Sequence, residues 1–591
     1  MSSPSHSDTG LEMALGVLLG ASGLGAALWA GVAASAWVSG HRVPHVQLLD
    51  GFIAFAHARN PSVAWHAPVG PAVLYWTLSA LVVVATGLGF YGCWRQLRST
   101  GTQAKVGDPL RADGLATRAE VRTAAGAKAL LQRARTLRPG LARPRACDVG
   151  YRLGTSRGVE CWASVEDSML LLGPPRSGKG MSLVIPMILD APGALVTTST
   201  RPDNLAVTLS ARATGGPVMV FDPQRLAQSK NLPVSAWSLV RGCEDPQVAM
   251  IRAEALVADA GGAGVENANF WRTQAVSATR AMLHAGALDG RSAADLYRWS
   301  HSAGLAKEAT SILASHASAT PGWDRALDAI ISADPRTRDS VWAMVANTFA
   351  PLADPAVLAA VSPKSGTELD PLAFLAMRGS IYLLGTATGA SATARLVAAL
   401  IEDLIDAARR LAARSAGQRL DPPLALVLDE AANYPLPSLP ALMAEGGGSG
   451  ITTLAVLQSL AQARDRWGRE AAGAIWDSAI VKVVLGGSAN ADDLADISRL
   501  VGEREVTERS ETVGAGSAGR STSTSIRYRP ILDPSEIRRL PFGTGLALLR
   551  SAPPIMMRLC PWTTRPDATE LTAARAGWET ATCHEAVEAD A

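Results

Sequence analysis

Cysteine is scarce in this chain, and its few copies follow no pattern. The 591 residues include six cysteines, with no C-x-x-C pair and no metal-ligand spacing among them. Small secreted proteins with a disulfide framework show regular cysteine spacings. The sequence therefore argues against such a framework and indicates a mainly reducing compartment.

An excess of charge of one sign is also missing. Lysine and arginine together number 55, aspartate and glutamate 53, and the formal net charge is +2. A protein that attracts nucleic acid over its whole surface would carry a strong basic field. Any nucleic-acid site of this chain must therefore be local.

Charged residues are absent from two long N-terminal stretches, residues 13–40 and 67–94. Each is longer than the roughly 20 apolar residues with which a helix spans a bilayer. A signal peptide would carry basic residues before its apolar core, and Met1–Glu12 has no lysine or arginine. Two buried helices of a soluble core are the alternative. We expect a transmembrane hairpin of two helices.

Basic residues are distributed unequally around these two stretches. Arg95, Arg98, Lys105 and Arg111 follow the second stretch, whereas Arg42 and Arg59 lie between the two. Short loops on the cytoplasmic side of a membrane carry the excess of basic residues. This bias predicts a two-pass protein of the inner or plasma membrane, with both termini and the large C-terminal part in the cytoplasm.

A glycine-rich segment follows a short apolar run at Met169–Leu172, which predicts a buried strand. Its residues are Gly173, Pro174, Pro175, Arg176, Ser177, Gly178, Lys179, Gly180 and Met181. The spacing G-x-x-x-x-G-K is typical of a phosphate-binding loop, in which backbone N–H groups converge on phosphate oxygens. Lys179 adds a positive charge near the β and γ phosphates. The alternative is a turn that matches this spacing by chance. We expect the loop to bind ATP together with Mg²⁺.

The hydroxyl that usually completes this motif is lacking. Gly180 stands where most phosphate-binding loops have a serine or threonine that binds Mg²⁺. Ser182 lies on another side of the helix that we expect after the loop, and it is a poor substitute. Pro186 is expected to kink or shorten that helix.

A second nucleotide-binding signature lies downstream. The apolar run Leu424–Leu428 ends in Asp429 and Glu430. At the end of a buried strand, Asp429 can hold Mg²⁺ through water, and Glu430 can orient and deprotonate the attacking water. The strand Ile451–Leu457 ends at Gln458, a polar residue that could sense the γ-phosphate or position the water.

The strand signal vanishes between about residues 225 and 379, where helical patterns predict an all-helical insert. One helix is expected at Arg118–Arg135, a mobile loop at Glu511–Ser525, the last strand of the sheet near Gly545–Leu549, and a loose tail over the last thirty residues. The expected divisions are a transmembrane hairpin (1–98), a cytoplasmic linker with leading strands (99–165), a nucleotide-binding domain in two parts (166–228 and 379–560), the insert (229–378) and the tail (561–591).

Several motifs occur together in one order. They are Gly173–Gly180 with Val184–Pro186, Val220–Pro223, Phe270–Trp271, Leu428–Ala431, Gln458–Ser459, Ile497–Gly502 and Arg529–Glu536. In these motifs the chain resembles the type IV coupling proteins, the TraG-type ATPases of conjugative DNA transfer, from about Leu170 to Pro553. Glycine after the loop lysine also occurs in that family.

The resemblance implies an α/β fold: a RecA-like P-loop NTPase with a parallel sheet, an all-helical insert and a two-helix membrane anchor. It implies an ATPase that drives DNA, expected to be single-stranded, or a relaxase–DNA complex or other secreted protein toward the components of a type IV secretion channel. It also implies a homo-hexamer, in which the insert contacts the cargo.

The chain departs from that family at two places. Members often carry an acidic or basic residue after the strand at 194–198, where this chain has Thr198–Arg201. Members often have an arginine finger before the strand that ends at Gln458, where this chain has Glu445–Ser449; Arg464 and Arg466 are the nearest substitutes. A nucleotide-switched receptor without motor activity and an FtsK-like DNA translocase are the alternative functions.

Overall fold

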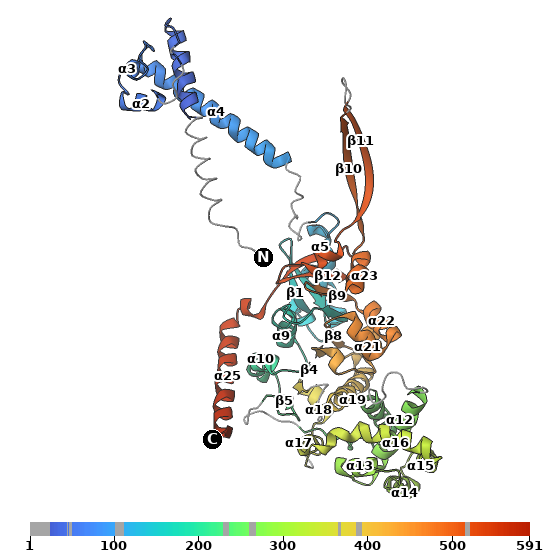
Figure 1. Cartoon of the computed structure of the whole chain (residues 1–591). Helices are drawn as coiled ribbons and strands as arrows, with labels where there is room; N and C mark the ends of the chain where they lie inside the picture. The colour runs from blue at the N-terminus through green and yellow to red at the C-terminus, as the bar shows by residue number, and fades with distance from the viewer. Residues whose placement is uncertain are drawn as a thin grey trace. The chain divides into compact units, whose positions relative to one another are not determined.

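The computed structural model describes residues 24–43, 45, 50–100, 112–227, 236–258, 268–364, 368–385, 393–513 and 520–590. Contacts divide the chain into two compact units, residues 1–107 and 108–591. Figure 1 shows the elements of both.

The first unit is helical. It contains an apolar helix at Leu24–Val38, α2 (Asp50–Ala56), α3 (Pro61–Ala64) and α4 (Ala72–Thr100). A Cβ atom added to Gly31 would lie 2.2 Å from the hydroxyl of Ser79. The first helix and α4 therefore approach each other closely at a position that requires glycine.

Within the described residues, one helix is long and apolar enough to cross a membrane, with its apolar window at Ala72–Gly89. The helix at Leu24–Val38 is apolar but shorter. Residues 13–23 of the first expected span lie outside the described residues. The predicted anchor of two spans is therefore not confirmed.

The second unit is built on a sheet that has 11 strands among the described residues. The order is β2-β1-β13-β12-β9-β3-β8-β7-β4-β6-β5. The strands from β9 to β5 in this order all run parallel, whereas β12, β13, β1 and β2 pair antiparallel. The mixed α/β fold with a large parallel sheet is as predicted.

The bounds of the strands agree well with the apolar runs of the sequence. The parallel strands are β3 (Met169–Leu172), β4 (Leu195–Ser199), β5 (Val218–Phe221), β6 (Ser380–Leu384), β7 (Leu424–Leu428), β8 (Ile451–Leu457) and β9 (Val481–Leu485). The others are β1 (Gly150–Ser156), β2 (Val159–Ser164), β12 (Thr544–Leu549) and β13 (Ile555–Leu559).

Both faces of the sheet are covered. Leu170 and Leu172 belong to one hydrophobic cluster, and Met169 and Leu171 to the other. Successive side chains of a strand point to opposite faces, so a continuous apolar run indicates burial on both sides. The first cluster extends into α19 (Ala394–Ala413), and the second includes residues of α9 (Ile185–Asp190) and α10 (Asp203–Ala213).

Between β5 and β6 the described elements are helical, apart from an isolated bridge between Ala236 and Glu368, and the insert as a separate domain stays a prediction. The helical elements are α11 (Pro246–Val257), α12 (Ala268–Leu288), α13 (Ala293–Ser300), α14 (Lys307–Ser315), α15 (Trp323–Ile331), α16 (Pro335–Phe349), a 3₁₀ turn η3 (Ala350–Ala353), α17 (Pro355–Ala360) and α18 (Pro371–Ala376). Several begin with an aspartate cap followed by proline; at α16, Asp334 accepts hydrogen bonds from the N–H groups of Arg336 and Thr337.

Four secondary-structure predictions are wrong. The helix expected at Arg118–Arg135 is divided into α5 (Arg118–Ala125), α6 (Ala127–Gln132) and α7 (Ala134–Leu137). Gly126 separates the first two because its backbone is extended (φ −73°, ψ 150°). The sheet also continues past β12 to β13, which lies between β12 and β1.

The mobile loop expected at Glu511–Ser525 is wrong for its described residues. β10 (Glu503–Val513) and β11 (Arg520–Pro530) pair as a long antiparallel hairpin (Figure 1). Threonine, valine, isoleucine and tyrosine favour strands, and this preference outweighs the polar composition. Residues 514–519 lie outside the described residues.

The loose tail is also wrong. The C-terminal residues form α25 (Ala568–Asp590), which packs beside α10. Leu571 and Trp562 bury themselves against Ile185 and Val207, and Arg565 pairs with Asp190 at 2.8 Å. Burial of these apolar side chains fixes the start of the helix to the sheet domain.

Candidate functional site: a phosphate loop and two carboxylates at one sheet edge

The predicted site residues meet at one edge of the sheet. The glycine-rich loop follows β3, Asp429 and Glu430 follow β7, and Gln458 follows β8. β8 lies between β3 and β7 and runs parallel to both. The carboxyl ends of parallel strands open at a common edge, which is where α/β sheets bind ligands.

The loop after β3 has the backbone that a phosphate loop needs. Gly173 donates its N–H to the carbonyl of Leu457 (3.0 Å), which ties the loop to β8. Gly178 has a φ of +86°, and a Cβ atom there would lie 2.9 Å from the ring of Phe542. A residue with a side chain would therefore be strained at position 178 and would collide with its neighbour.

The helix after the loop begins with a widened turn. Residues Gly180–Val184 form a π-helical turn (η2), and α9 follows at Ile185–Asp190. Pro186 has no N–H group to donate to the preceding turn, and π-turns are frequent at functional sites. The irregularity expected at Pro186 is present directly before it.

Three buried polar atoms of the loop and the carboxylates lack hydrogen-bond partners among the described residues: Ser177 Oγ, Lys179 Nζ and Asp429 Oδ1. The acid paired with Lys179 is Glu430, with 4.0 Å between Nζ and Oε1. Burial raises the pKa of Asp429, and the positive charge of Lys179 opposes this shift. An unpartnered buried polar atom is costly, so these three atoms fit a ligand that carries charge of both signs.

The sequence prediction missed a group of residues that hold the two carboxylates. Thr198 Oγ1 donates to the backbone oxygen of Asp429 (2.9 Å), and Thr200 Oγ1 donates to Glu430 Oε2 (3.0 Å). Asn433 Nδ2 donates to the same Oε2 atom at 2.9 Å. The residues Thr198–Arg201, a departure from the family pattern, thus contact the second nucleotide signature directly.

The backbone around Glu430 is held in an uncommon conformation. Glu430 has φ 54° and ψ 48°, the left-handed region that non-glycine residues rarely adopt. Tyr434 donates its hydroxyl to the carbonyl oxygens of Ser199 (3.0 Å) and Gly385. The end of β4 therefore fixes the strained segment on both sides. Such strain persists only where surrounding contacts determine it, and it gathers at functional sites.

Gln458 is half-buried at the same edge. It lines a small cavity together with Gly173 and Pro174. Its N–H donates to Gln462 Oε1 at 3.3 Å. The structure brings Gln458 beside the start of the phosphate loop, and its role stays a prediction.

The two substitute arginines lie on α21 (Leu460–Trp467). Arg464 pairs with Asp493 (3.1 Å), whose other oxygen accepts the N–H of Leu460 at the start of the same helix. Arg466 lies 3.9 Å from Asp465. Arg464 is thus engaged within its own chain, where it compensates a buried carboxylate.

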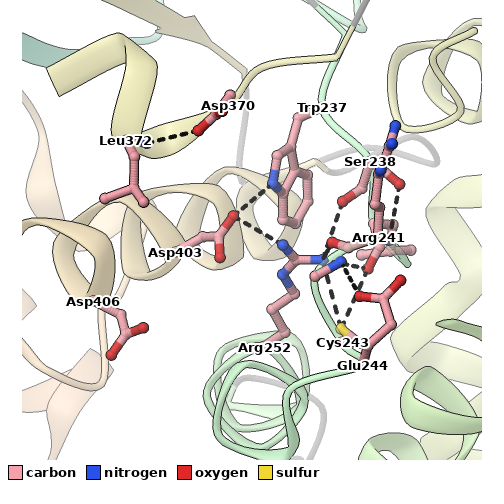
Figure 2. Close-up of polar contacts among 12 residues, drawn as sticks. Trp237, Ser238, Arg241, Cys243, Glu244, Arg252, Asp370, Leu372, Asp403 and Asp406 are labelled. Atoms are coloured by element: carbon pink, nitrogen blue, oxygen red, sulfur yellow. Dashed lines mark hydrogen bonds and ion pairs between the residues drawn. The ribbon is translucent and has the colours of Figure 1, made fainter. Parts of the chain in front are cut away.

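Another cluster of buried charges lies away from these residues, where α11 of the insert meets α19. Figure 2 shows Arg252 stacked against Trp237, with Asp403 accepting hydrogen bonds from both. Arg252 Nη1 also donates to the backbone oxygens of Ser238, Leu239 and Arg241. The cavity beside it, of about 540 Å³, is lined by arginines and acids in similar number. These charges largely neutralise one another.

Comparison with known proteins supports the family resemblance. The family model described as "TraM recognition site of TraD and TraG" matches residues 423–542, which include β7, β8 and the hairpin. No match was found among curated protein sequences.

Solved structures show a similar fold. The unbound bacterial conjugative coupling protein TrwBdeltaN70 superimposes with a TM-score of 0.52 at 18% identity, over 74% of this chain and 92% of that one. TrwB in complex with ADP and Mg²⁺ gives a TM-score of 0.51 at 18% identity, over 69% and 89% of the two chains. With the family match, this likeness of fold confirms the resemblance to TraG-type coupling proteins.

Proposed function

We propose that this chain is a membrane-anchored ATPase that recruits DNA, or a relaxase–DNA complex, and drives it into a type IV secretion channel. The observation that carries the proposal is the meeting of Lys179 from one motif with Asp429 and Glu430 from another at one sheet edge, with polar atoms among them that have no hydrogen-bond partner in the described residues. The cargo and the channel are proposed from the resemblance to TraG-type coupling proteins.

The residues present fit a nucleotide with its magnesium ion. The backbone of Gly173–Met181 and the Lys179 ammonium would hold the phosphates. Magnesium at phosphate sites is held by one or two carboxylates and keeps several waters; Asp429, with a free buried oxygen, would hold it through water. Among the described residues, no group of three or more His, Cys, Asp or Glu side chains is arranged to hold a metal ion. The bound ion would neutralise charge on the phosphates.

Glu430 is the proposed general base. It would accept a proton from a water molecule, whose oxygen forms a bond to the γ-phosphorus as the bond between that phosphorus and the ADP oxygen breaks. Its Oε2 atom is held by Thr200 and Asn433, so Oε1 is the oxygen that faces Lys179. Gln458 would position the water or sense the γ-phosphate.

The proposed assembly is a homo-hexamer attached to the inner or plasma membrane. The helix that contains Ala72–Gly89 supports an anchor, and the proposed topology has two passes with the ATPase unit in the cytoplasm. Single-stranded DNA and relaxase are the proposed cargo of the helical insert, and components of the secretion channel are the membrane partners.

A receptor that binds nucleotide as a switch, without motor activity, is the second candidate. The pairing of Arg464 with Asp493 favours it, because an arginine engaged in its own chain cannot also serve a neighbouring subunit without breaking that pair. Glu445–Ser449 offers no arginine in its place.

ATP turnover by the full-length chain in detergent distinguishes the two candidates. We expect Mg²⁺-dependent phosphate release that increases with single-stranded or double-stranded DNA and with protein concentration, because RecA-like motors complete their sites at subunit interfaces. Nucleotide binding without turnover under every condition would favour the receptor. Absence of Mg²⁺-dependent nucleotide binding would contradict both.

A further inference from the structure

Position 180, where most phosphate-binding loops have a hydroxyl, faces the side chain of Asn204. Apart from its chain neighbours and its own helix backbone, a Cβ atom added to Gly180 would have one neighbour within 4 Å among the described residues, the amide oxygen of Asn204, at 4.0 Å. A hydroxyl on that Cβ would therefore lie within hydrogen-bonding reach of Asn204 Oδ1. Position 180 itself has room for a side chain.

Asn204 also contacts the carboxylate that we assign to the metal. Its Nδ2 atom donates to Asp429 Oδ2 at 3.5 Å, which directs Oδ1 of the same amide elsewhere. Asn204 is 4% exposed and lies in the first turn of α10. The amide thus bridges the loop position that lacks its hydroxyl and the second nucleotide signature.

The chemistry of this donor set suits magnesium. Carboxylate and amide oxygens are ligands that Mg²⁺ accepts, whereas the nitrogen and sulfur ligands of zinc sites are not among these groups. The unpartnered Oδ1 atom of Asp429 is a second, independent sign that a cation belongs here. Both oxygens lie in the buried part of the site.

We propose that Asn204 replaces the loop hydroxyl: its amide oxygen holds the magnesium ion, directly or through one water, in the role that a serine or threonine at position 180 would have. The inference rests on the proposed nucleotide site and adds a residue that neither nucleotide motif contains. It explains how a loop with Gly180 can retain metal-dependent nucleotide binding.

The test measures the Mg²⁺ concentration that gives half-maximal binding of a fluorescent ATP analogue to the full-length chain. For Asn204→Leu we expect this concentration to rise about tenfold, as when a group that orients a metal is lost. The affinity measured in EDTA should not change. Electron paramagnetic resonance of Mn²⁺, with ADP present, should show the same weakening without any turnover.

Restoring the hydroxyl provides the sharpest control. Gly180→Ser in the Asn204→Leu background should return the half-maximal concentration to within about threefold of wild type, because the new hydroxyl lies beside the lost amide. Asn204→Asp keeps an oxygen and should retain metal binding. Gln247→Leu removes an amide of the helical insert that contacts Asp406 and should leave the Mg²⁺ dependence unchanged.

An unchanged Mg²⁺ dependence in Asn204→Leu, or failure of Gly180→Ser to restore it, would overturn the inference. Equal loss of affinity with Mg²⁺ and in EDTA would give Asn204 a structural role and overturn it as well. In these cases the wild type still binds nucleotide and Lys179→Ala does not, so the proposed function stands. A wild-type chain without Mg²⁺-dependent binding would remove both.

Discussion

Two of the buried charge clusters among the described residues differ in how closely their charges are paired. Arg252 is neutralised by Asp403, covered by Trp237 and bound by backbone oxygens, and of its nitrogens only Nε has no hydrogen-bond partner among the described residues. Lys179 Nζ and Asp429 Oδ1, in contrast, have no hydrogen-bond partner among the described residues. A buried charge with a close counter-ion serves the fold, whereas a buried ammonium and a buried carboxylate oxygen that make no hydrogen bond fit a charged ligand.

The largest effects are expected for Lys179 and Glu430 in the candidate nucleotide site. Lys179→Ala should abolish nucleotide binding, and Glu430→Gln should retain binding but lower the turnover rate by about 10²–10⁴-fold, since it keeps the size of the side chain and removes the base. Binding of the fluorescent analogue and single-turnover phosphate release measure the two steps. Normal turnover by Glu430→Gln would show that another group is the base.

Substitutions in the cluster of Arg252 and Asp403 should lower the stability of the protein and leave nucleotide binding unchanged. Arg252→Met leaves Asp403 buried without its cation, which costs about 3–5 kcal/mol of unfolding free energy when one partner of such a pair is removed. Thermal unfolding of the full chain reports the loss. Arg414→Met, at an exposed position of the same cavity, is the matched control and should change stability by less than about 0.5 kcal/mol. Similar values for the two variants would contradict the distinction.

A smaller effect is expected for Thr200, whose hydroxyl makes a hydrogen bond within the site. Thr200→Val removes the hydroxyl that holds Glu430 Oε2 and should lower kcat about tenfold with KM for ATP unchanged. Thr200→Ser keeps the hydroxyl and should restore kcat. If kcat is normal in Thr200→Val, or if Thr200→Ser behaves like Thr200→Val, the hydroxyl does not position the base.

The smallest effect is expected for Arg464. Arg464 is half-exposed, and the buried Asp493 keeps the N–H of Leu460 as a donor, so Arg464→Ala should cost at most about 1 kcal/mol and reduce turnover less than threefold. An arginine finger would behave differently, with a loss of about 10³-fold or more. In that case, mixing Arg464→Ala with Lys179→Ala should restore part of the activity, because the second variant can donate its arginine to an intact site.

The motifs that could be read from the sequence depend on local geometry. A phosphate loop requires glycine at particular backbone positions, and Gly178, with its positive φ, occupies one. A parallel strand buried on both faces requires an unbroken apolar run, which β3, β7 and β8 provide. Both requirements act within a few consecutive residues, so loop, strands and acidic pair were predictable.

Contacts between distant segments were not predictable in the same way. The sequence of α25 by itself predicts a loose tail. The helix is stabilised by the packing of its first turns against α10. The hairpin of β10 and β11 has a polar composition, and only the pairing of its strands distinguishes it from a loop. In each case the stabilising partner lies elsewhere in the chain.

The candidate site also has features that contiguous motifs determine and features that only the tertiary structure determines. The sequence by itself determined which residues can cradle phosphate and supply carboxylates, because those abilities reside in contiguous motifs. Only the tertiary structure decided that β4 lies beside β7, which places Thr200 on Glu430 and Asn204 between Gly180 and Asp429. The physical reason is that the order of parallel strands in a sheet results from packing of the whole domain and leaves no local signature in the strands that it makes neighbours.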